Sequence, residues 1–285
     1  MPEIVASPMD LIRAGAARLR RAGVPEPGRE ARELWDAASE PGGTARAWAG
    51  QQRSTTEEVA RAFDRLLRRR TVGEPVAHLT GEAGFRHLVL RADRRALIPR
   101  PETEGLVDLL LARVGTGRVA DLGTGTGCLA LSLRQEGDFE LVVAVERAPD
   151  ALALAAENRR RTGLDVQLVC ADFAAPLGTS GFDAIVSNPP YLTESEYAGL
   201  DPSVRKWEPA AALMGGEDGL SATRTVLAQG LVALRPGGWI AVEIDCRRAE
   251  QAGRLASGMG WSGVTVQDDL FGRARYLLAR RSEPA

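Results

Sequence analysis

The chain has 285 residues, enough for one large domain or for one domain with a small companion. Hydrophobic residues make up 44% and charged residues 26%, which is ordinary for a globular protein, and the net charge of -2 does not indicate a broad basic surface for nucleic acid. The 3 cysteines and 2 histidines form neither a disulfide framework nor a metal-ligand spacing. Because there is no signal peptide and no long apolar stretch, we expect a cytoplasmic protein that does not enter a membrane.

The first 72 residues are predicted to be helical. Ser7-Pro8 is expected to cap and start a first helix. Apolar residues at helical spacing indicate a second helix over residues 29–38, which the Pro41–Gly43 stretch ends, and a third that Thr55 or Thr56 can cap. Because this segment carries no metal, nucleotide or catalytic pattern of its own, we interpret residues 1–72 as a domain that docks the substrate.

Three arginines, Arg68 to Arg70, end the third predicted helix. Positive charge is favourable at the carboxyl end of a helix, where the helix dipole is negative. We therefore favour a solvated last turn for this run over a contact with RNA.

The sequence pattern changes at Gly73, where a turn is predicted. Residues 85–90 alternate apolar and polar side chains as a strand does, and we expect residues 73–98 to form a β-hairpin linker. The remaining segment, residues 99–285, is predicted to form the main domain. Pro101 can start its first helix, with Glu102 and Glu104 at the positive end.

An apolar strand that begins at Val119 runs into a glycine-rich turn, and a helix over residues 128–133 follows. Gly123, Gly125 and Gly127 would let the backbone approach a ligand closely. The spacing resembles a dinucleotide fingerprint but lacks its usual order. The charge of Asp121, near the end of the strand, would repel a phosphate, whereas it suits a ligand with an ammonium or hydroxyl group.

Acidic residues follow the next two predicted strands. The strand over residues 141–145 ends in Glu146, about 20 positions after the glycines, which suits binding to ribose hydroxyls. A helix over residues 150–161 and a strand over residues 166–169 come next. Beyond that strand, Asp172 could accept a hydrogen bond from an exocyclic amine, and Phe173 could pack on a purine.

The tetrapeptide Asn188-Pro189-Pro190-Tyr191 follows a buried parallel strand over residues 182–187. Ligands bind past the carboxyl ends of strands in open α/β sheets. The prolines remove two backbone donors, which leaves the carbonyls of Asn188 and Pro189 as acceptors, and Tyr191 adds a flat aromatic wall. The stretch therefore suits a planar –NH2 group, the alternative being a proline turn that only closes the strand.

The rest of the chain continues the α/β pattern. A long polar loop leads to Gly215-Gly216 and is expected to act as a lid or a binding wall. A helix over residues 219–234 should stop at Arg235-Pro236-Gly237-Gly238. A strand over 239–244, a helix over 247–259 and two last strands over 264–267 and 274–279 follow, the last two as an antiparallel pair at the sheet edge.

These motifs resemble those of class I S-adenosylmethionine (SAM) methyltransferases. More narrowly, the chain is similar to the protein-(glutamine-N5) methyltransferases that modify peptide chain release factors (the PrmC/HemK family). The glycine turn is shared by many methyltransferases, and the Asn-Pro-Pro-Tyr motif by enzymes that methylate adenine amines, whereas the Ile98–Thr103 stretch is more specific. The resemblance covers about residues 74 to 280 and rests on residues 74–81, 97–104, 121–127, 187–191, 204–216 and 218–220.

The resemblance implies a class I methyltransferase (Rossmann-like) fold: a seven-stranded, mostly parallel sheet with an antiparallel edge pair, plus a small N-terminal helical domain. The implied substrate is the glutamine of the Gly-Gly-Gln motif in class 1 release factors, and the implied methyl donor is SAM, with S-adenosylhomocysteine as product. Methyl transfer would be a direct in-line displacement without a metal or a covalent intermediate. We expect a monomer without direct binding to nucleic acid.

The resemblance also implies residue roles. Asn188 would meet both SAM and substrate, and Asn188 and the Pro189 carbonyl would grip the glutamine amide in a slot that Pro190 and Tyr191 shape. Glu146 would hold the ribose. The turn that would bind the methionine part comprises Asp121, Gly123, Thr124, Gly125, Thr126 and Gly127, and the adenine would lie against Asp172 and Phe173.

Two positions depart from the family pattern. Asp245 stands where the family often has glycine in a Glu-x-Gly motif, and the ribose-binding acid is Glu146 instead of the shorter aspartate. Two alternatives remain: an adenine-N6 methyltransferase acting on nucleic acid, against which the acidic balance stands, and a SAM-binding regulatory module, which would predict a damaged amine grip.

Overall fold

The structure is a computed structural model that describes residues 7–39, 56–175, 177–179 and 181–283. Its contacts divide the chain into two units. The first, the helical unit, comprises Met1–Glu82 with Asp201–Trp207, and the second, the sheet unit, comprises Ala83–Leu200 with Glu208–Ala285. The division at residues 72 and 98 stays a prediction. No helix within the described ranges is long and apolar enough to cross a bilayer.

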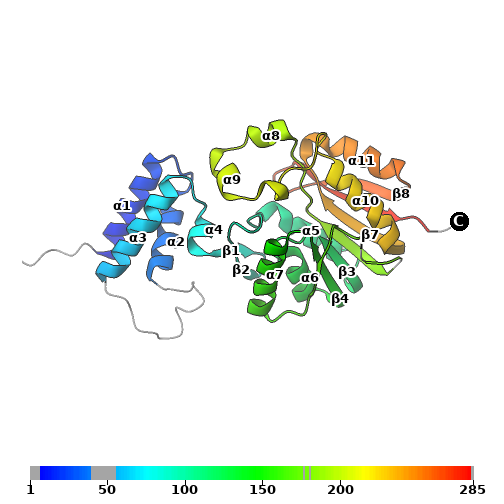
Figure 1. The fold of residues 1–285 in the computed structure, drawn as a ribbon, viewed down its shortest axis with the longest axis horizontal. Helices are drawn as coiled ribbons and strands as arrows, with labels where there is room; N and C mark the ends of the chain where they lie inside the picture. The colour runs from blue at the N-terminus through cyan, green and yellow to red at the C-terminus, as the bar shows by residue number, and fades with distance from the viewer. Residues whose placement is uncertain (1–6, 40–55, 176, 180, 284–285) are drawn as a thin grey trace, which may run out of the picture. The chain divides into compact units, whose positions relative to one another are not determined.

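The helical unit contains α1 (Pro8–Arg21), α2 (Pro27–Ser39), α3 (Thr56–Thr71) and the short α4 (Val76–Thr80) (Figure 1). The Ser7 side chain accepts a hydrogen bond from the backbone N–H of Asp10, which confirms the predicted cap of the first helix. The predicted break at Pro41–Gly43 and the predicted capping side chain at Thr55 or Thr56 lie outside the described residues. The helices bury a small apolar core of Leu19, Val24, Ala31, Leu34, Phe63, Leu67 and Leu79.

The arginine run at the end of α3 is held in ion pairs within the helical unit. Arg70 contacts Glu30 at 2.6 Å with both side chains largely buried. Arg69 contacts the buried Glu74 at 2.7 Å, and Arg68 contacts Asp64 at 2.8 Å. The prediction of a solvated turn is therefore wrong for Arg70, because a glutamate from a distant helix covers it.

The predicted hairpin is present, but its turn lies inside the run that was expected to be one strand. Strands β1 (Glu82–Phe85) and β2 (Leu88–Arg91) pair across Arg86 and His87. Arg86 adopts a left-handed conformation with φ of 51°. Its side chain donates to Glu136 at 2.7 Å, which anchors the turn within the sheet unit.

The sheet unit contains a seven-stranded sheet in the order β5-β4-β3-β6-β7-β9-β8. All strand pairs are parallel except those of β9, which runs antiparallel to β7 and β8. This confirms the predicted mostly parallel sheet with an antiparallel pair at one edge. The strands are β3 (Thr116–Leu122), β4 (Asp138–Glu146), β5 (Gln167–Cys170), β6 (Phe182–Ser187), β7 (Leu234–Glu243), β8 (Trp261–Asp268) and β9 (Ala274–Arg281).

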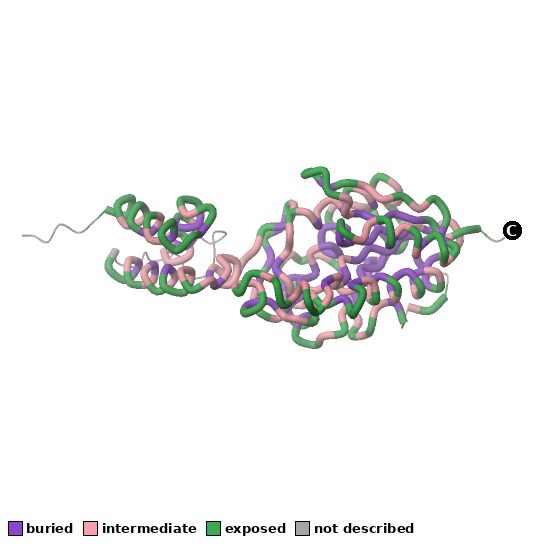
Figure 2. Tube along the Cα trace, turned by 90° about the horizontal axis from the view of Figure 1, so that it is seen from above, coloured by how far each residue is buried: buried purple, intermediate pink, exposed green. Residues whose placement is uncertain are grey.

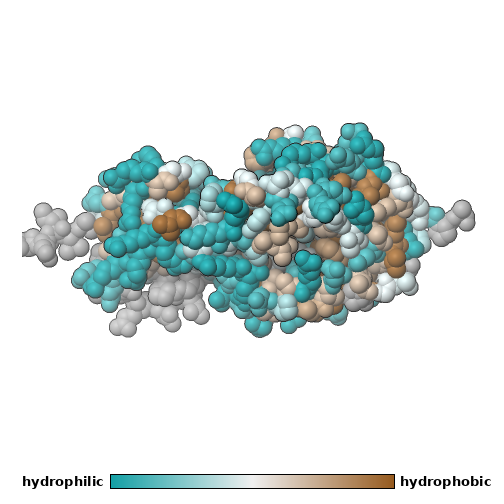
Figure 3. Space-filling view, turned by 45° about the horizontal axis from the view of Figure 1, so that its top comes forward, coloured by the Kyte–Doolittle hydropathy of each residue, from teal (hydrophilic) through white to brown (hydrophobic). Residues whose placement is uncertain are grey.

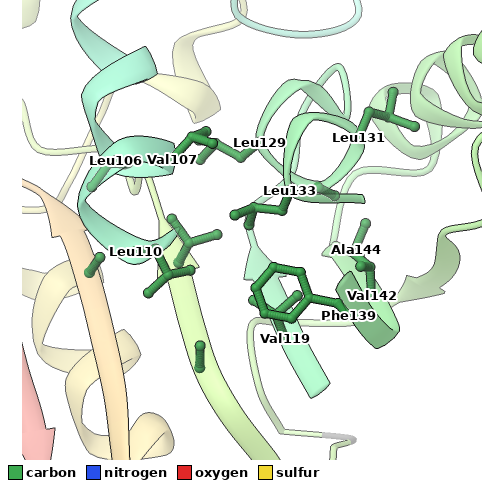
Figure 4. Packing of buried hydrophobic residues seen from close by; sticks show 14 of the residues in the cluster. Leu106, Val107, Leu110, Val119, Leu129, Leu131, Leu133, Phe139, Val142 and Ala144 are labelled. Carbon is green, nitrogen blue, oxygen red and sulfur yellow. The ribbon is translucent and has the colours of Figure 1, made fainter. Parts of the chain in front are cut away.

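Helices cover both faces of this sheet, and the buried residues gather along it (Figures 1 and 2). Apolar side chains of α5 and α6 pack on one face, against β3 and β4 (Figure 4). Those of α10 and α11 pack on the other face. The helices are α5 (Glu104–Leu111), α6 (Cys128–Glu136), α7 (Pro149–Thr162), α10 (Ser221–Ala233) and α11 (Ala249–Gly258), with 3-10 turns η2 (Pro101–Thr103) before α5 and η4 (Cys246–Arg248) before α11.

The predicted helix stop is confirmed, since α10 ends at Ala233, just before Arg235–Gly238. Two other expectations about the second half of the chain are wrong. The strand expected over residues 239–244 begins earlier, because β7 starts at Leu234 directly after α10 and includes Arg235–Gly238. The expected polar loop contains α8 (Glu194–Ala198), α9 (Pro202–Trp207) and the 3-10 turn η3 (Ala210–Ala212). Thr193 and Glu196 cap α8 reciprocally, a pattern that the sequence carries and that could have predicted this helix.

Candidate active site

A cavity of about 340 Å³ lies in the sheet unit, where the segments that follow β3, β4, β5 and β6 meet. We call this side of the sheet the carboxyl edge, because the parallel strands end there. The volume lies within the range of small-molecule sites, roughly 300–1,000 Å³. The predicted site residues that line the cavity are Gly123, Thr124, Gly125, Thr126, Glu146, Asp172, Phe173, Asn188 and Pro190.

Four predicted site residues do not line the cavity. Asp121 is fully buried beneath the glycine turn. Gly127 precedes the first residue of α6 with φ of 86°. Pro189 is buried, and the Tyr191 hydroxyl bonds to Glu243 instead. Asp121 and Tyr191 therefore hold neighbouring residues in place through hydrogen bonds instead of lining the cavity.

The glycine turn requires glycine for conformational reasons. Gly123, Gly125 and Gly127 all have positive φ, at 76°, 56° and 86°. The N–H of Gly125 donates to Glu146 at 3.1 Å, and the N–H of Ala148 donates to the other oxygen of the same carboxylate at 2.9 Å. Glu146 is thus held in place by backbone donors while it faces the cavity.

Asp121 organises the base of the turn. Its Oδ2 atom accepts a hydrogen bond from the Thr124 hydroxyl at 2.5 Å and one from the N–H of Ala130 at 3.1 Å. Burial raises the pKa of Asp121 to about 7, against the opposing effect of these two hydrogen bonds. The structure thus places Asp121 where it fixes the turn, not where a ligand could touch it from the cavity.

Phe173 lies against the same turn. Its backbone has φ of 50°, an uncommon conformation for a residue with a side chain. A Cβ atom added to Gly123 would lie 3.6 Å from the Phe173 ring, so ring and turn are close neighbours. Asp172 lines the cavity beside them. The strained backbone therefore places an aromatic ring at the cavity wall.

The Asn188 amide is oriented by a residue that sequence reasoning missed. Asn188 donates from Nδ2 to the hydroxyl of Thr103 at 3.0 Å. Thr103 in turn donates to the buried carboxylate of Glu243 at 2.6 Å. Because Nδ2 is engaged, Oδ1 is the atom of this amide that can accept a hydrogen bond from another group.

Glu243 also contacts the other end of the tetrapeptide. The Tyr191 hydroxyl donates to its Oε1 atom at 3.3 Å, and Arg275 lies 3.9 Å from the same oxygen. Burial raises the pKa of Glu243, and burial together with this carboxylate raises the pKa of Tyr191. One buried carboxylate thus positions both Asn188 and Tyr191.

The part of the cavity wall that Ile98 and Arg100 form is fixed by a second buried carboxylate. Glu208 accepts hydrogen bonds from Arg100 at 2.6 Å and from the N–H of Ile98 at 3.4 Å. This bond joins the Leu97–Glu104 stretch to the segment after α9. Gly215 then packs so tightly on the tetrapeptide that a Cβ atom there would lie 2.4 Å from the carbonyl oxygen of Pro190.

Asp245 replaces the glycine of the family pattern without backbone strain. Its φ of -69° and ψ of 125° are ordinary for any residue. The carboxylate accepts from the N–H of Arg247 at 2.9 Å and pairs with Arg248 at 2.6 Å. Although burial raises the pKa of Asp245, these two arginines outweigh burial and hold that pKa below its ordinary value.

Comparisons with known proteins agree with this geometry. The PrmC N-terminal domain matches residues 10–81, and the methyltransferase small domain matches residues 102–200. Two solved structures of methyltransferases share the fold over about two thirds of this chain. A methyltransferase from Pyrococcus furiosus has a TM-score of 0.52 at 20% identity and covers 68% of this chain and 89% of its own. The 16S rRNA N2 G1207 methyltransferase of T. thermophilus has a TM-score of 0.51 at 19% identity, over 70% of this chain and 49% of its own.

Curated relatives match nearly the whole chain. The release factor glutamine methyltransferase of Deinococcus radiodurans is 43% identical over 277 residues, which span 96% of this chain and 98% of that protein. The protein of the same name from Rhodospirillum rubrum is 38% identical and covers 95% of this chain and 84% of its own. The chain therefore belongs to the family of release factor glutamine methyltransferases.

Proposed function

We propose that this protein transfers a methyl group from SAM to the side-chain amide nitrogen (N5) of the glutamine in the Gly-Gly-Gln motif of class 1 peptide chain release factors. The observation that carries the proposal is the Asn188 amide, which lines the cavity and whose orientation Thr103 fixes. The relatives named above support the choice of substrate. They also argue against the adenine-N6 alternative, because they match nearly the full length of the chain.

The residues of the cavity suit SAM. Gly123 and Gly125 line the cavity without Cβ atoms, which leaves room beside the turn for the methionine part. The Glu146 carboxylate can accept from the ribose hydroxyls, and Asp172 and Phe173 offer an acceptor and an aromatic face for the adenine. When bound, SAM supplies an electrophilic methyl group on a sulfonium sulfur and leaves as S-adenosylhomocysteine.

The chain's task is to make an amide nitrogen reactive. That nitrogen is a poor nucleophile because its lone pair is delocalised into the carbonyl group. We propose that Asn188 Oδ1 and the Pro189 carbonyl each accept one of the two N–H groups, while Pro190 flanks the amide plane. This holds the nitrogen toward the donor and stabilises the positive charge that develops on it, by positioning and fixed dipoles instead of a strong base.

The same grip favours release of the product. The starting amide has two N–H groups for two acceptors. Once the methyl group is on the nitrogen, the cationic amide loses one proton to water, so the methylated amide has only one N–H group. Either Asn188 or the Pro189 carbonyl therefore loses its partner after the reaction. An unpaired polar group in a site costs free energy, so the product should bind more weakly than the substrate.

We propose that residues 1–72 dock the release factor, because one glutamine side chain offers too little surface for recognition. We propose further that the enzyme acts as a monomer. Since translation termination takes place in the cytoplasm, the proposed substrate places the enzyme there as well.

Replacing Asn188 tests the proposal. In Asn188→Ala we expect the methylation rate on a class 1 release factor to fall by about 100-fold or more, with unchanged SAM affinity by calorimetry. Gln251→Ala, which removes an exposed amide on α11, serves as the matched control and should keep full activity. An Asn188→Ala enzyme that methylates at the normal rate would rule out the proposed grip.

A further inference from the structure

Two apolar side chains stand exposed at the tip of the β8–β9 hairpin. Leu270 is 100% exposed and Phe271 is 70% exposed. They occupy a tight turn in which the N–H of Gly272 donates to the carbonyl of Asp269 at 2.9 Å. Such turns favour glycine, asparagine, aspartate, serine and proline, so leucine and phenylalanine are unusual here. On the face that Figure 3 shows, hydrophobic residues form small separate patches on a mainly hydrophilic surface. Two adjacent exposed apolar side chains therefore indicate a contact site for a partner.

Hydrogen bonds to one buried carboxylate hold the backbone of the hairpin tip. The Asp269 carboxylate accepts from the N–H of Phe271 at 2.9 Å and from the N–H of Arg273 at 3.0 Å, and its second oxygen accepts from Arg275 at 2.8 Å. The Asp269 side chain is 1% exposed. The turn therefore presents Leu270 and Phe271 in a fixed arrangement, which lowers the entropic cost of binding a partner.

The tip lies at the carboxyl edge of the sheet, as the cavity does, because β9 begins beside the last residue of β7. A chain of polar contacts links the two places. Arg275 contacts both Asp269 and Glu243. Glu243 accepts from Thr103, which holds the Asn188 amide. The base of the hairpin and the proposed glutamine grip are thus parts of one network.

We propose that Leu270 and Phe271 form a docking contact for the protein substrate, by inserting into an apolar surface of the release factor beside the Gly-Gly-Gln loop. The inference rests on the proposed function. A glutamine that enters the cavity brings its flanking polypeptide to the carboxyl edge, where this exposed pair stands. The contact would supply part of the binding surface that a single amide lacks. Its link to Glu243 would keep that surface at a fixed position relative to Asn188, which binds the glutamine amide.

The test uses the full-length enzyme with Leu270→Ser and Phe271→Ser combined. We expect the KM for a full-length class 1 release factor to rise at least 10-fold, with kcat at saturation and SAM affinity within twofold of the unaltered enzyme. Val232→Ser is the matched control: this side chain is 52% exposed on α10, just before β7 begins, at the opposite edge of the sheet. The control should leave every parameter unchanged.

Direct binding of the release factor, measured by calorimetry with S-adenosylhomocysteine present, separates this inference from the proposed function. If the unaltered enzyme binds the factor without methylating it, the proposed function fails. The dissociation constants of the unaltered enzyme and of the double variant for the factor still decide the hairpin's role. An unchanged dissociation constant and KM in the double variant would overturn the docking contact. The docking contact would also be overturned if the unaltered enzyme did not bind the factor. It would likewise be overturned if the unaltered enzyme self-associated and the double variant did not, since the tip would then pair with a second copy of the chain.

Discussion

At the scale of single residues, the structure ties the proposed chemistry to a threonine hydroxyl. Asn188 can present its acceptor atom only if its amide does not rotate, and the Thr103 hydroxyl holds the Nδ2 atom at 3.0 Å. Thr103→Val keeps the shape of this buried side chain but removes both hydrogen bonds. We expect kcat to fall about 10-fold, which is less than for the loss of Asn188 itself. The Asn188 amide would still be present and would adopt the productive orientation for part of the time.

Thr103→Ser is the control for this prediction. It keeps the hydroxyl, so its kcat should stay within about twofold of the unaltered enzyme, and SAM affinity by calorimetry should not change in either variant. Equal kcat values for the valine and serine variants would show that the hydroxyl does not position Asn188.

Asp121 makes folding stability depend on pH. Burial raises its pKa from the ordinary aspartate value of 3.8 to about 7, with a smaller contribution from the charge of Glu146. Because the folded protein holds the proton more tightly than the unfolded chain does, this group stabilises the fold at low pH, and the contribution is lost as pH rises toward 7. Asp121→Asn keeps an acceptor for Thr124 but cannot ionise.

We therefore compare the free energies of unfolding of the asparagine variant and the unaltered protein at pH 5.5 and at pH 8. The difference in favour of the variant should be larger at pH 8, by about 2 kcal/mol. Urea unfolding of both proteins without cofactor, at the two pH values, measures this difference. Free energies of unfolding that change in parallel with pH would show that Asp121 ionises in the fold as easily as in the unfolded chain.

At the scale of elements, the segment after η3 acts as a backing for the tetrapeptide. The N–H of Gly215 donates to the carbonyl of Leu192 at 2.8 Å, and there is no room for a side chain between Gly215 and the backbone of Pro190 and Tyr191. In Gly215→Ala the added methyl group must push that backbone aside. We expect kcat/KM to fall at least 100-fold and the melting temperature to drop by several degrees, because the clash is with backbone atoms that cannot rotate away.

Gly258→Ala is the matched control, since a Cβ at the end of α11 meets nothing within 4 Å. Its activity should be unchanged, and its melting temperature should be equal or slightly higher because alanine favours a helix. If Gly215→Ala is as active as this control, the backing segment does not fix the tetrapeptide.

The sequence predicted elements well where periodicity and strand ends mark them. The apolar run over residues 182–187 coincides with β6, and the glycine turn lies directly between β3 and α6. The end of α10 was also predicted correctly, but the next strand was expected to begin only at residue 239, because two glycines and a proline in Arg235–Gly238 do not favour a strand. Pairing with β6 carries β7 through this stretch, with a shift in register between Phe182 and Ala184. Tertiary pairing thus overrode a local turn signal.

The same limit explains which site residues were missed. Glycines and acidic residues that follow strands indicate a ligand site, because their position at the sheet edge follows from the strand pattern. Thr103 carries no such signal: its role depends on Glu243 and Asn188, which lie 140 and 85 positions away. Glu208 likewise acts through Arg100, 108 positions earlier. Hydrogen bonds over such separations appear only when the chain has folded.

At the scale of the whole molecule, the two units are proposed to divide recognition and chemistry. The helical unit has its own apolar core, and the proposed site for SAM and the glutamine lies in the sheet unit. A chain without residues 1–70 should therefore keep its SAM affinity but show a KM for full-length release factor that is at least 10-fold higher. Normal kinetics on the full-length factor would refute a docking role for the N-terminal helices.

The most direct test of the central claim is the mass of a purified class 1 release factor after incubation with this protein and SAM. We predict a gain of one methyl group, which fragmentation places on the glutamine of the Gly-Gly-Gln motif, and no gain with Asn188→Ala over the same time. An unmodified release factor, under conditions where calorimetry shows that SAM is bound, would contradict the proposed reaction, and a methyl group on another residue would contradict the proposed grip.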